Sequence, residues 1–130
     1  MIKPNSILEV NTKNLIYNYK ALSKISYNSL CAATVKADAY GIGAIKTIEL
    51  LEKNQCKHFF LATLEEALLV RKKNKKITLY VLNGLESHNL LVFKKNNLIP
   101  IINSIKELKL FIKNNNFKKS INYGLHIDTG

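Results

Sequence analysis

Hydrophobic residues gather in short runs at fairly even spacing along the chain. Each run has about the length of one strand, and β-branched side chains are frequent in the runs. They occupy residues 30–35, 58–62, 77–82, 98–102 and 121–127. This pattern predicts five buried strands.

The segments between the runs have the periodicity of amphipathic helices. The predicted helices cover residues 44–53, 64–73, 87–96 and 104–115. Ser104 as N-cap, with Glu107 three residues on, predicts a capping box at the start of the last one. The alternation of strand and helix favours a parallel sheet of right-handed βαβ units.

One further unit precedes this repeat. Residues 6–10 are strand-like, and residues 12–25 are predicted to form a helix with Leu15, Tyr19 and Leu22 on one apolar stripe. A strand at 6–10 would need a partner for its apolar side chains.

The predicted class is α/β, but alternation alone does not separate a doubly wound sheet from a (β/α)8 barrel. The chain has no GxGxxG or GxxxxGK[ST] motif, the commonest nucleotide-binding signatures of open sheets. A closed barrel needs roughly 250 residues, and this chain has 130. If the fold is a barrel, we expect it to be incomplete.

The chain is strongly basic, with a net charge of +11 and a sequence pI near 9.7. Of its 20 basic residues only Arg71 is an arginine. Surfaces that read bases depend on arginine, whose fork pairs bidentately with guanine. Specific nucleic-acid binding is therefore not expected.

The two cysteines, Cys31 and Cys56, lack the spacing of a zinc site. We expect Cys31 to fill a strand interior and the chain to hold no metal. No run of about 18 apolar residues occurs, and the N-terminus lacks the apolar region of a signal peptide. The chain is predicted to be cytoplasmic and not membrane-bound.

Lys36 is the residue most suggestive of chemistry. It follows the run 30–35, and Tyr40, Gly41 and Gly43 lie in the predicted loop behind it. A lysine at the C-terminal end of a buried strand emerges where α/β enzymes keep their active sites. A free amine there can attack an aldehyde cofactor, although a lysine after a strand is also an ordinary surface residue.

Four segments resemble signatures of the alanine racemase family, in the order in which that family has them. Residues 35–43 (VKADAYGIG) resemble the cofactor signature VKA(N/D)AYGxG, and residues 61–67 (LATLEEA) resemble the segment vAtleEA. Residues 77–84 resemble the third barrel strand, and residues 126–130 (HIDTG) resemble the DTGM strand. The resemblance covers essentially the whole chain.

This resemblance implies the N-terminal part of a TIM (β/α)8 barrel that binds pyridoxal 5′-phosphate, with about five strands. It also implies interconversion of L- and D-alanine, D-alanine for peptidoglycan, and a homodimer of the full-length protein. Lys36 would form the aldimine with the cofactor and act as one base, while Tyr40 would contact the phosphate and Leu82 would lie beside the ring. His126 stands where many relatives have a lysine; it is either a donor at the site or a strand residue bonded to a neighbour.

The resemblance also implies parts that we do not find between residues 1 and 130. The family's C-terminal β domain has no counterpart among these residues. In the family, that domain of the partner subunit supplies the tyrosine that acts as second base, so this tyrosine has no counterpart either. We therefore expect domain 1–130 to be a truncated barrel domain. Two alternatives stay open, a non-catalytic pyridoxal-phosphate-binding or homeostasis protein and an inactive remnant.

Overall fold

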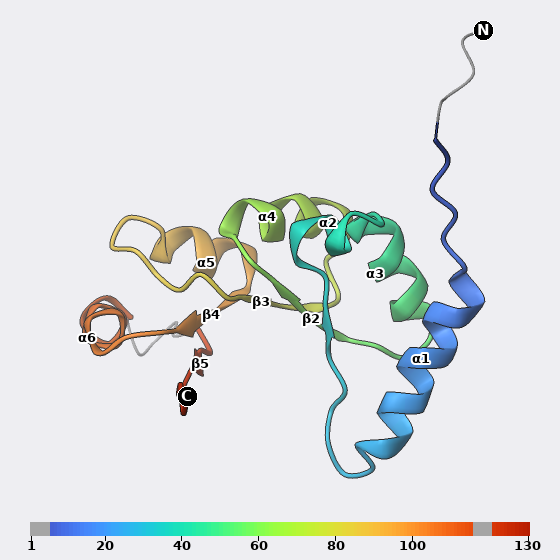
Figure 1. Cartoon of the computed structure of the whole chain (residues 1–130). Helices are drawn as coiled ribbons and strands as arrows, with labels where there is room; N and C mark the ends of the chain where they lie inside the picture. The colour runs from blue at the N-terminus through green and yellow to red at the C-terminus, as the bar shows by residue number, and fades with distance from the viewer. Residues whose placement is uncertain (1–5, 116–120) are drawn as a thin grey trace, which may run out of the picture.

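The computed structural model describes residues 6–115 and 121–130, in which strands and helices alternate (Figure 1). The strands are β1 (Ala33–Thr34), β2 (His58–Leu61), β3 (Thr78–Val81), β4 (Leu98–Ile102) and β5 (Gly124–Leu125). The helices are α1 (Thr12–Ile25), α2 (Lys36–Tyr40), α3 (Ala44–Lys53), α4 (Leu64–Lys73), α5 (Leu90–Asn96) and α6 (Ile105–Asn114). None of the described helices is long and apolar enough to cross a bilayer.

The five strands form one parallel sheet in chain order, β1-β2-β3-β4-β5. A doubly wound sheet reverses its strand order at a switch point, whereas a barrel adds each new strand beside the last. The order found here has no reversal. It confirms the prediction of five parallel strands that form an incomplete barrel.

Strand side chains alternate between two faces of the sheet. On the face that α2 to α5 cover (Figure 1), Phe59, Leu61, Leu79 and Val81 are buried with 0–1% of their surface exposed. On the opposite face the rings of Phe60 and Tyr80 stack at 4.5 Å. The core therefore lies between the sheet and its helices.

Four predicted elements agree with the structure at both ends: α1, α3, α4 and β4. The strand predicted at residues 6–10 was wrong, because the described residues there form none, and Ile7 and Leu8 are 79% and 71% exposed. Without a neighbouring strand to pair with, an extended segment gains no ladder hydrogen bonds.

The first and fifth strands are shorter than predicted, with two residues each. Each pairs on one side only, β1 with β2 and β5 with β4. Backbone bonds extend both ladders a little, from Val35 N–H to the Phe60 carbonyl (2.8 Å) and from His126 N–H to the Ile102 carbonyl (3.0 Å). The helix predicted at 87–96 begins only at Leu90.

The cysteine prediction also needs correction. Cys31 lies before β1 and is only half-buried, whereas Cys56 is fully buried and both are free thiols. The Tyr19 hydroxyl donates to the Cys31 carbonyl (3.3 Å) and fastens α1 to this region. Burial raises the pKa of the Cys56 thiol and, with the nearby Cys56, raises the pKa of Tyr19 to about 12.

The capping box predicted at Ser104 and Glu107 forms only in part. Ser104 Oγ accepts from the Glu107 N–H (3.2 Å), but the Glu107 carboxylate accepts from the N–H of Asn103 (3.0 Å) and not from that of Ser104. A complete box occurs instead at α4, between Thr63 and Glu66.

Arg71, the single arginine, is 4% exposed and joins two segments from inside the protein, the one between α4 and β3 and the one between α5 and β4. Its guanidinium donates to the carbonyls of Asn74 (3.2 Å), Ile77 (2.9 Å) and Asn97 (2.9 Å). These carbonyls lie near the N-terminal ends of β3 and β4, opposite the edge where Lys36 lies. Burial lowers the pKa of this guanidinium.

We predict that Arg71→Met lowers the free energy of unfolding by about 2–3 kcal/mol, because buried carbonyls lose charged donors. The matched control is Lys72→Met, at an exposed neighbour on the same helix. Urea unfolding followed by circular dichroism measures both. Equal midpoints for the two variants would show that the Arg71 bonds give no net stability.

Candidate functional site

Lys36 lies directly after the sheet at the carboxyl end of β1. Thr34 is level with Phe60 in the parallel register, and the Val35 bond to Phe60 continues the ladder by one residue. Lys36 is the next residue and the first of α2. In (β/α) folds this edge of the sheet carries the active site.

Lys36 differs from the other lysines in its burial. Among the lysines in the described ranges, only Lys36 and Lys94 are half-buried, and all others are exposed. No ion pair to Lys36 is found in the part of the chain that the structure describes, where the only lysine pair joins Lys57 to Glu52 (3.9 Å). Its amine is therefore not committed to a carboxylate.

The residues after Lys36 form a turn of left-handed helix, which the sequence did not predict. Ala37, Asp38 and Ala39 have φ, ψ of 50°, 51°, of 52°, 46° and of 54°, 48°, and Tyr40 has φ 56°. A bond from the Gly41 N–H to the Ala37 carbonyl (3.0 Å) closes the turn. We call residues 37–40 the left-handed turn.

Left-handed backbone costs about 1–2 kcal/mol for each residue that carries a Cβ. Four such residues in a row need compensation from their surroundings. Gly41 and Gly43 have φ of 89° and 98°, which glycine adopts without a steric penalty, but the unusual backbone starts before them.

Two carboxylates hold the left-handed turn. Glu66 Oε1 accepts from the Ala37 N–H (2.8 Å), and Asp38 Oδ1 accepts from the Ala44 N–H at the start of α3 (2.7 Å). Bonds to a charged acceptor contribute roughly 1.5–3 kcal/mol each, which is the order of the backbone cost. Ala39, 4% exposed, packs the middle of the turn into the core.

Tyr40 ends the left-handed turn and projects from it, with 66% of its surface exposed. Its hydroxyl is therefore at the surface, four residues after Lys36 and at the same edge of the sheet. A phenol there can donate to an anionic group.

Leu82 and His126 line a broad open cavity of about 1010 Å³ at the carboxyl ends of β2 to β5. Its other lining residues include Phe60, Asn103 and Asp128. Lys36 and Tyr40 are not among its lining residues, so the structure groups Leu82 with His126 and leaves Lys36 and Tyr40 outside this cavity.

Leu82 follows β3 as Lys36 follows β1. Leu61 is level with Val81, and the Leu82 N–H continues that ladder to the Leu61 carbonyl (2.9 Å). Lys36 and Leu82 therefore lie at the same end of the sheet, after strands that have β2 between them, although the chain leaves the ladder at Val35 (ψ 26°) and turns into α2.

His126 Nδ1 lies 3.0 Å from Asn103 Oδ1, and Asn103 Nδ2 donates to the Leu82 carbonyl (2.8 Å). This pairing matches the second of the two readings, a strand residue bonded to a neighbour. Asn103 was not predicted as a site residue, and neither was Glu66. Thr63 and Glu66 have the spacing of a capping box, so this contact could have been predicted from the sequence. The bond from the Ala37 N–H to Glu66 spans 29 positions, and no local pattern indicates it.

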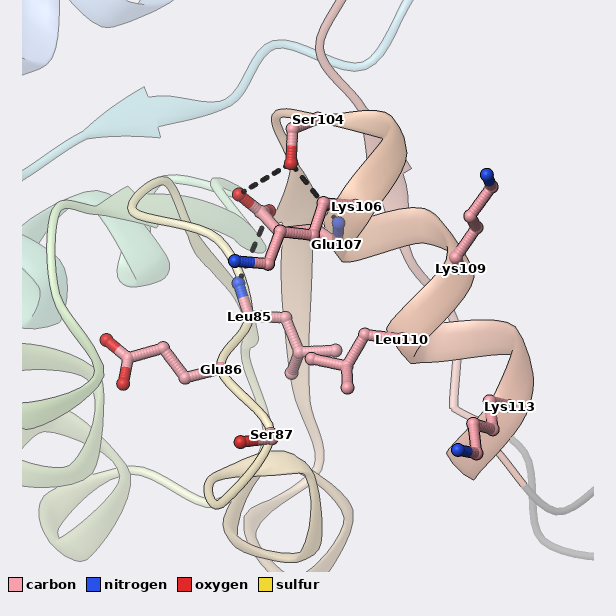
Figure 2. A pocket seen from close by; sticks show the side chains of 9 residues that line it. All are labelled: Leu85, Glu86, Ser87, Ser104, Lys106, Glu107, Lys109, Leu110 and Lys113. Carbon is pink, nitrogen blue, oxygen red and sulfur yellow. Dashed lines mark hydrogen bonds between the residues drawn. The ribbon is translucent and has the colours of Figure 1, made fainter.

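A separate cavity of about 560 Å³ lies between α6 and the segment after β3 (Figure 2). Leu85, Glu107 and Leu110 line it together with Lys106, Lys109 and Lys113. It contains none of the predicted site residues. Within residues 6–115 and 121–130, no group of three His, Cys, Asp or Glu side chains is arranged to bind a metal ion.

Comparison with known proteins gives consistent matches. The family model of the alanine racemase N-terminal domain matches residues 10–130. An alanine racemase of Rickettsia typhi is 39% identical over 125 residues, which are 95% of this chain and 31% of that protein. The chain thus spans about a third of the length of such relatives.

Solved structures agree. Alanine racemase from Bartonella henselae, with covalently bound pyridoxal phosphate, matches with a TM-score of 0.74 and 26% identity, over 90% of this chain and 36% of that one. Alanine racemase from E. faecalis matches with a TM-score of 0.83 and 20% identity, over 93% of this chain and 33% of that one, and supports the fold alone.

We predict that Ala37→Val lowers the free energy of unfolding by about 1–2 kcal/mol relative to Ala37→Gly, because a branched side chain fits left-handed backbone poorly and glycine fits it well. Ala37 is exposed, so neither change removes core packing. Ala32→Val, at an exposed residue without positive φ, is the control and is expected to change stability little. Chemical denaturation measures all three. The left-handed turn would be refuted if Ala37→Val were as stable as Ala37→Gly.

Proposed function

Because the chain belongs to the alanine racemase family, through the N-terminal domain that its residues 10–130 match, we propose that it supplies the cofactor-binding part of an alanine racemase. The observation that carries this proposal is a half-buried lysine without an ion pair in the described residues, at the carboxyl end of a strand and before a braced left-handed turn. The substrate we propose is alanine, and the product D-alanine would serve peptidoglycan.

The residues present fit pyridoxal 5′-phosphate. The Lys36 amine is the group that would hold the cofactor covalently, and the exposed Tyr40 hydroxyl is a donor for its phosphate. Leu82, directly after β3 at the same end of the sheet, would offer an apolar contact for the ring. Bound there, the cofactor supplies an electron sink for the charge left when a substrate loses its α-proton.

In this proposal Lys36 also moves the proton. Its Nζ, once released from the cofactor, takes the α-proton on one face of the substrate and returns it. Racemisation needs a second base on the opposite face, which we propose comes from the partner subunit of a homodimer. Among the described residues we assign only the first base, and that base is Lys36.

The proposal predicts selective covalent labelling of Lys36. With one equivalent of pyridoxal phosphate followed by borohydride, peptide mass spectrometry is expected to find the adduct on the peptide that carries Lys36. Lys36→Ala should abolish this label, whereas Lys94→Ala, at the other half-buried lysine, should leave it intact. A label spread evenly over the exposed lysines in all three proteins would contradict the proposal.

Portions of the same samples that are withheld from borohydride separate the alternatives. Incubated with pyridoxal phosphate and L-alanine in deuterated buffer, an unreduced chain that has one base is expected to incorporate deuterium without forming D-alanine. A label without deuterium exchange would favour the non-catalytic binding protein, and no label at all would favour the inactive remnant.

A further inference from the structure

We propose that Glu66 is a positioning residue for Lys36: by accepting the Ala37 N–H it fixes the peptide group through which the chain leaves Lys36. This inference rests on the proposed function only for its consequence, the reactivity of the Lys36 amine. The contact between Glu66 and the Ala37 N–H is present in the structure and does not depend on the proposed function.

Glu66 uses its two carboxylate oxygens for two separate tasks. Oε2 accepts from the N–H groups of Ala62 (2.8 Å) and Thr63 (3.4 Å), which completes the capping box of α4. Oε1 accepts from the Ala37 N–H (2.8 Å), which lies in the preceding βα unit. A capping box requires only the first task, so the second oxygen is available to act on the left-handed turn.

The Ala37 N–H is well placed to control Lys36. It belongs to the peptide bond whose carbonyl is that of Lys36, so fixing this peptide plane fixes ψ of Lys36. The direction of the side chain follows from the backbone orientation at Cα. A free Ala37 N–H would let this plane rotate and would let the left-handed turn relax toward the favoured right-handed region.

Core packing reaches the left-handed turn at Ala39, which is 4% exposed. Beside Asp38 the packing is interrupted by a cavity of about 240 Å³, whose lining also includes Val35, Leu61 and Glu66. Where side chains leave such a space, the neighbouring segment lacks contacts on that side. The bonds of Glu66 and Asp38 therefore restrain the turn where packing does not.

The structure contains an internal control for this role. Glu107 has the same position in α6, three residues after its N-cap Ser104, and Oε2 accepts from Asn103 N–H (3.0 Å) and from Leu85 N–H (3.4 Å) in the segment after β3. Figure 2 shows Ser104 and Glu107 at the start of α6 facing Leu85. Both glutamates thus join a helix start to the segment after an earlier strand, but only Glu66 reaches the residue after Lys36.

Glu66→Gln separates the two tasks. A glutamine has one accepting oxygen, and its amide nitrogen donates only. The oxygen can keep the capping box, in which glutamine is also found, and the NH2 group then faces the Ala37 N–H without being able to accept from it. Glu107→Gln makes the same change at α6, and Glu65→Gln removes a charge at an exposed neighbour of Glu66.

The test uses the whole 130-residue chain and two measurements. The first is the rate at which one equivalent of pyridoxal phosphate labels Lys36, from borohydride quenching at timed intervals and peptide mass spectrometry. We expect Glu66→Gln to slow this rate about tenfold, and Glu107→Gln and Glu65→Gln to change it less than twofold. Equal rates for Glu66→Gln and Glu107→Gln would reduce Glu66 to a helix cap and overturn the proposal.

The second measurement needs no cofactor. Amide hydrogen exchange of Ala37, followed by NMR, is expected to be at least tenfold faster in Glu66→Gln and unchanged in Glu107→Gln. If the unsubstituted chain takes no label at Lys36, the proposed function fails, and this exchange rate alone decides the positioning role. Unchanged exchange at Ala37 in Glu66→Gln would overturn that role.

Discussion

The hydrogen bond between the Glu66 carboxylate and the Ala37 N–H, at 2.8 Å, is the contact on which the arrangement around Lys36 depends. Residues 37–40 occupy a backbone region that Ala and Tyr rarely adopt and that Asp adopts only as a single residue. Such a segment persists only where its surroundings determine it. Here a helix cap in one βα unit supplies the acceptor for the unit before it, so the site is assembled from both.

The sheet supplies the frame for this contact. Because its parallel strands follow chain order, their carboxyl ends meet along one edge. Lys36, Leu82 and His126 all come from that edge, although they belong to β1, β3 and β5 or to the residues directly after them. At the opposite end of the strands, Arg71 bonds to the segments that lead from α4 into β3 and from α5 into β4. Stability and candidate chemistry are thus at different ends of the same sheet.

Periodicity was sufficient to predict α1, α3, α4 and β4, because each has a strong pattern and packs as that pattern requires. It failed at residues 6–10, where an apolar segment has no partner to pair with. The position of Lys36 after a strand could be predicted from the sequence, and the family resemblance implied its chemical role. The left-handed turn was not readable, because Ala37 and Ala39 favour other backbone regions and their restraint comes from Glu66, far along the chain. Asn103, which links His126 to Leu82, was missed because its contacts also join residues that are far apart in the sequence.

The interior position of Arg71 determines what kind of positive charge the outside of the protein presents. With the only guanidinium enclosed, every other basic side chain is a lysine ammonium. An ammonium is a compact, strongly hydrated point charge, whereas a guanidinium pairs with a carboxylate or phosphate through two parallel bonds. Contacts between this surface and acidic molecules would therefore lack bidentate pairs and would be weakened by dissolved salt.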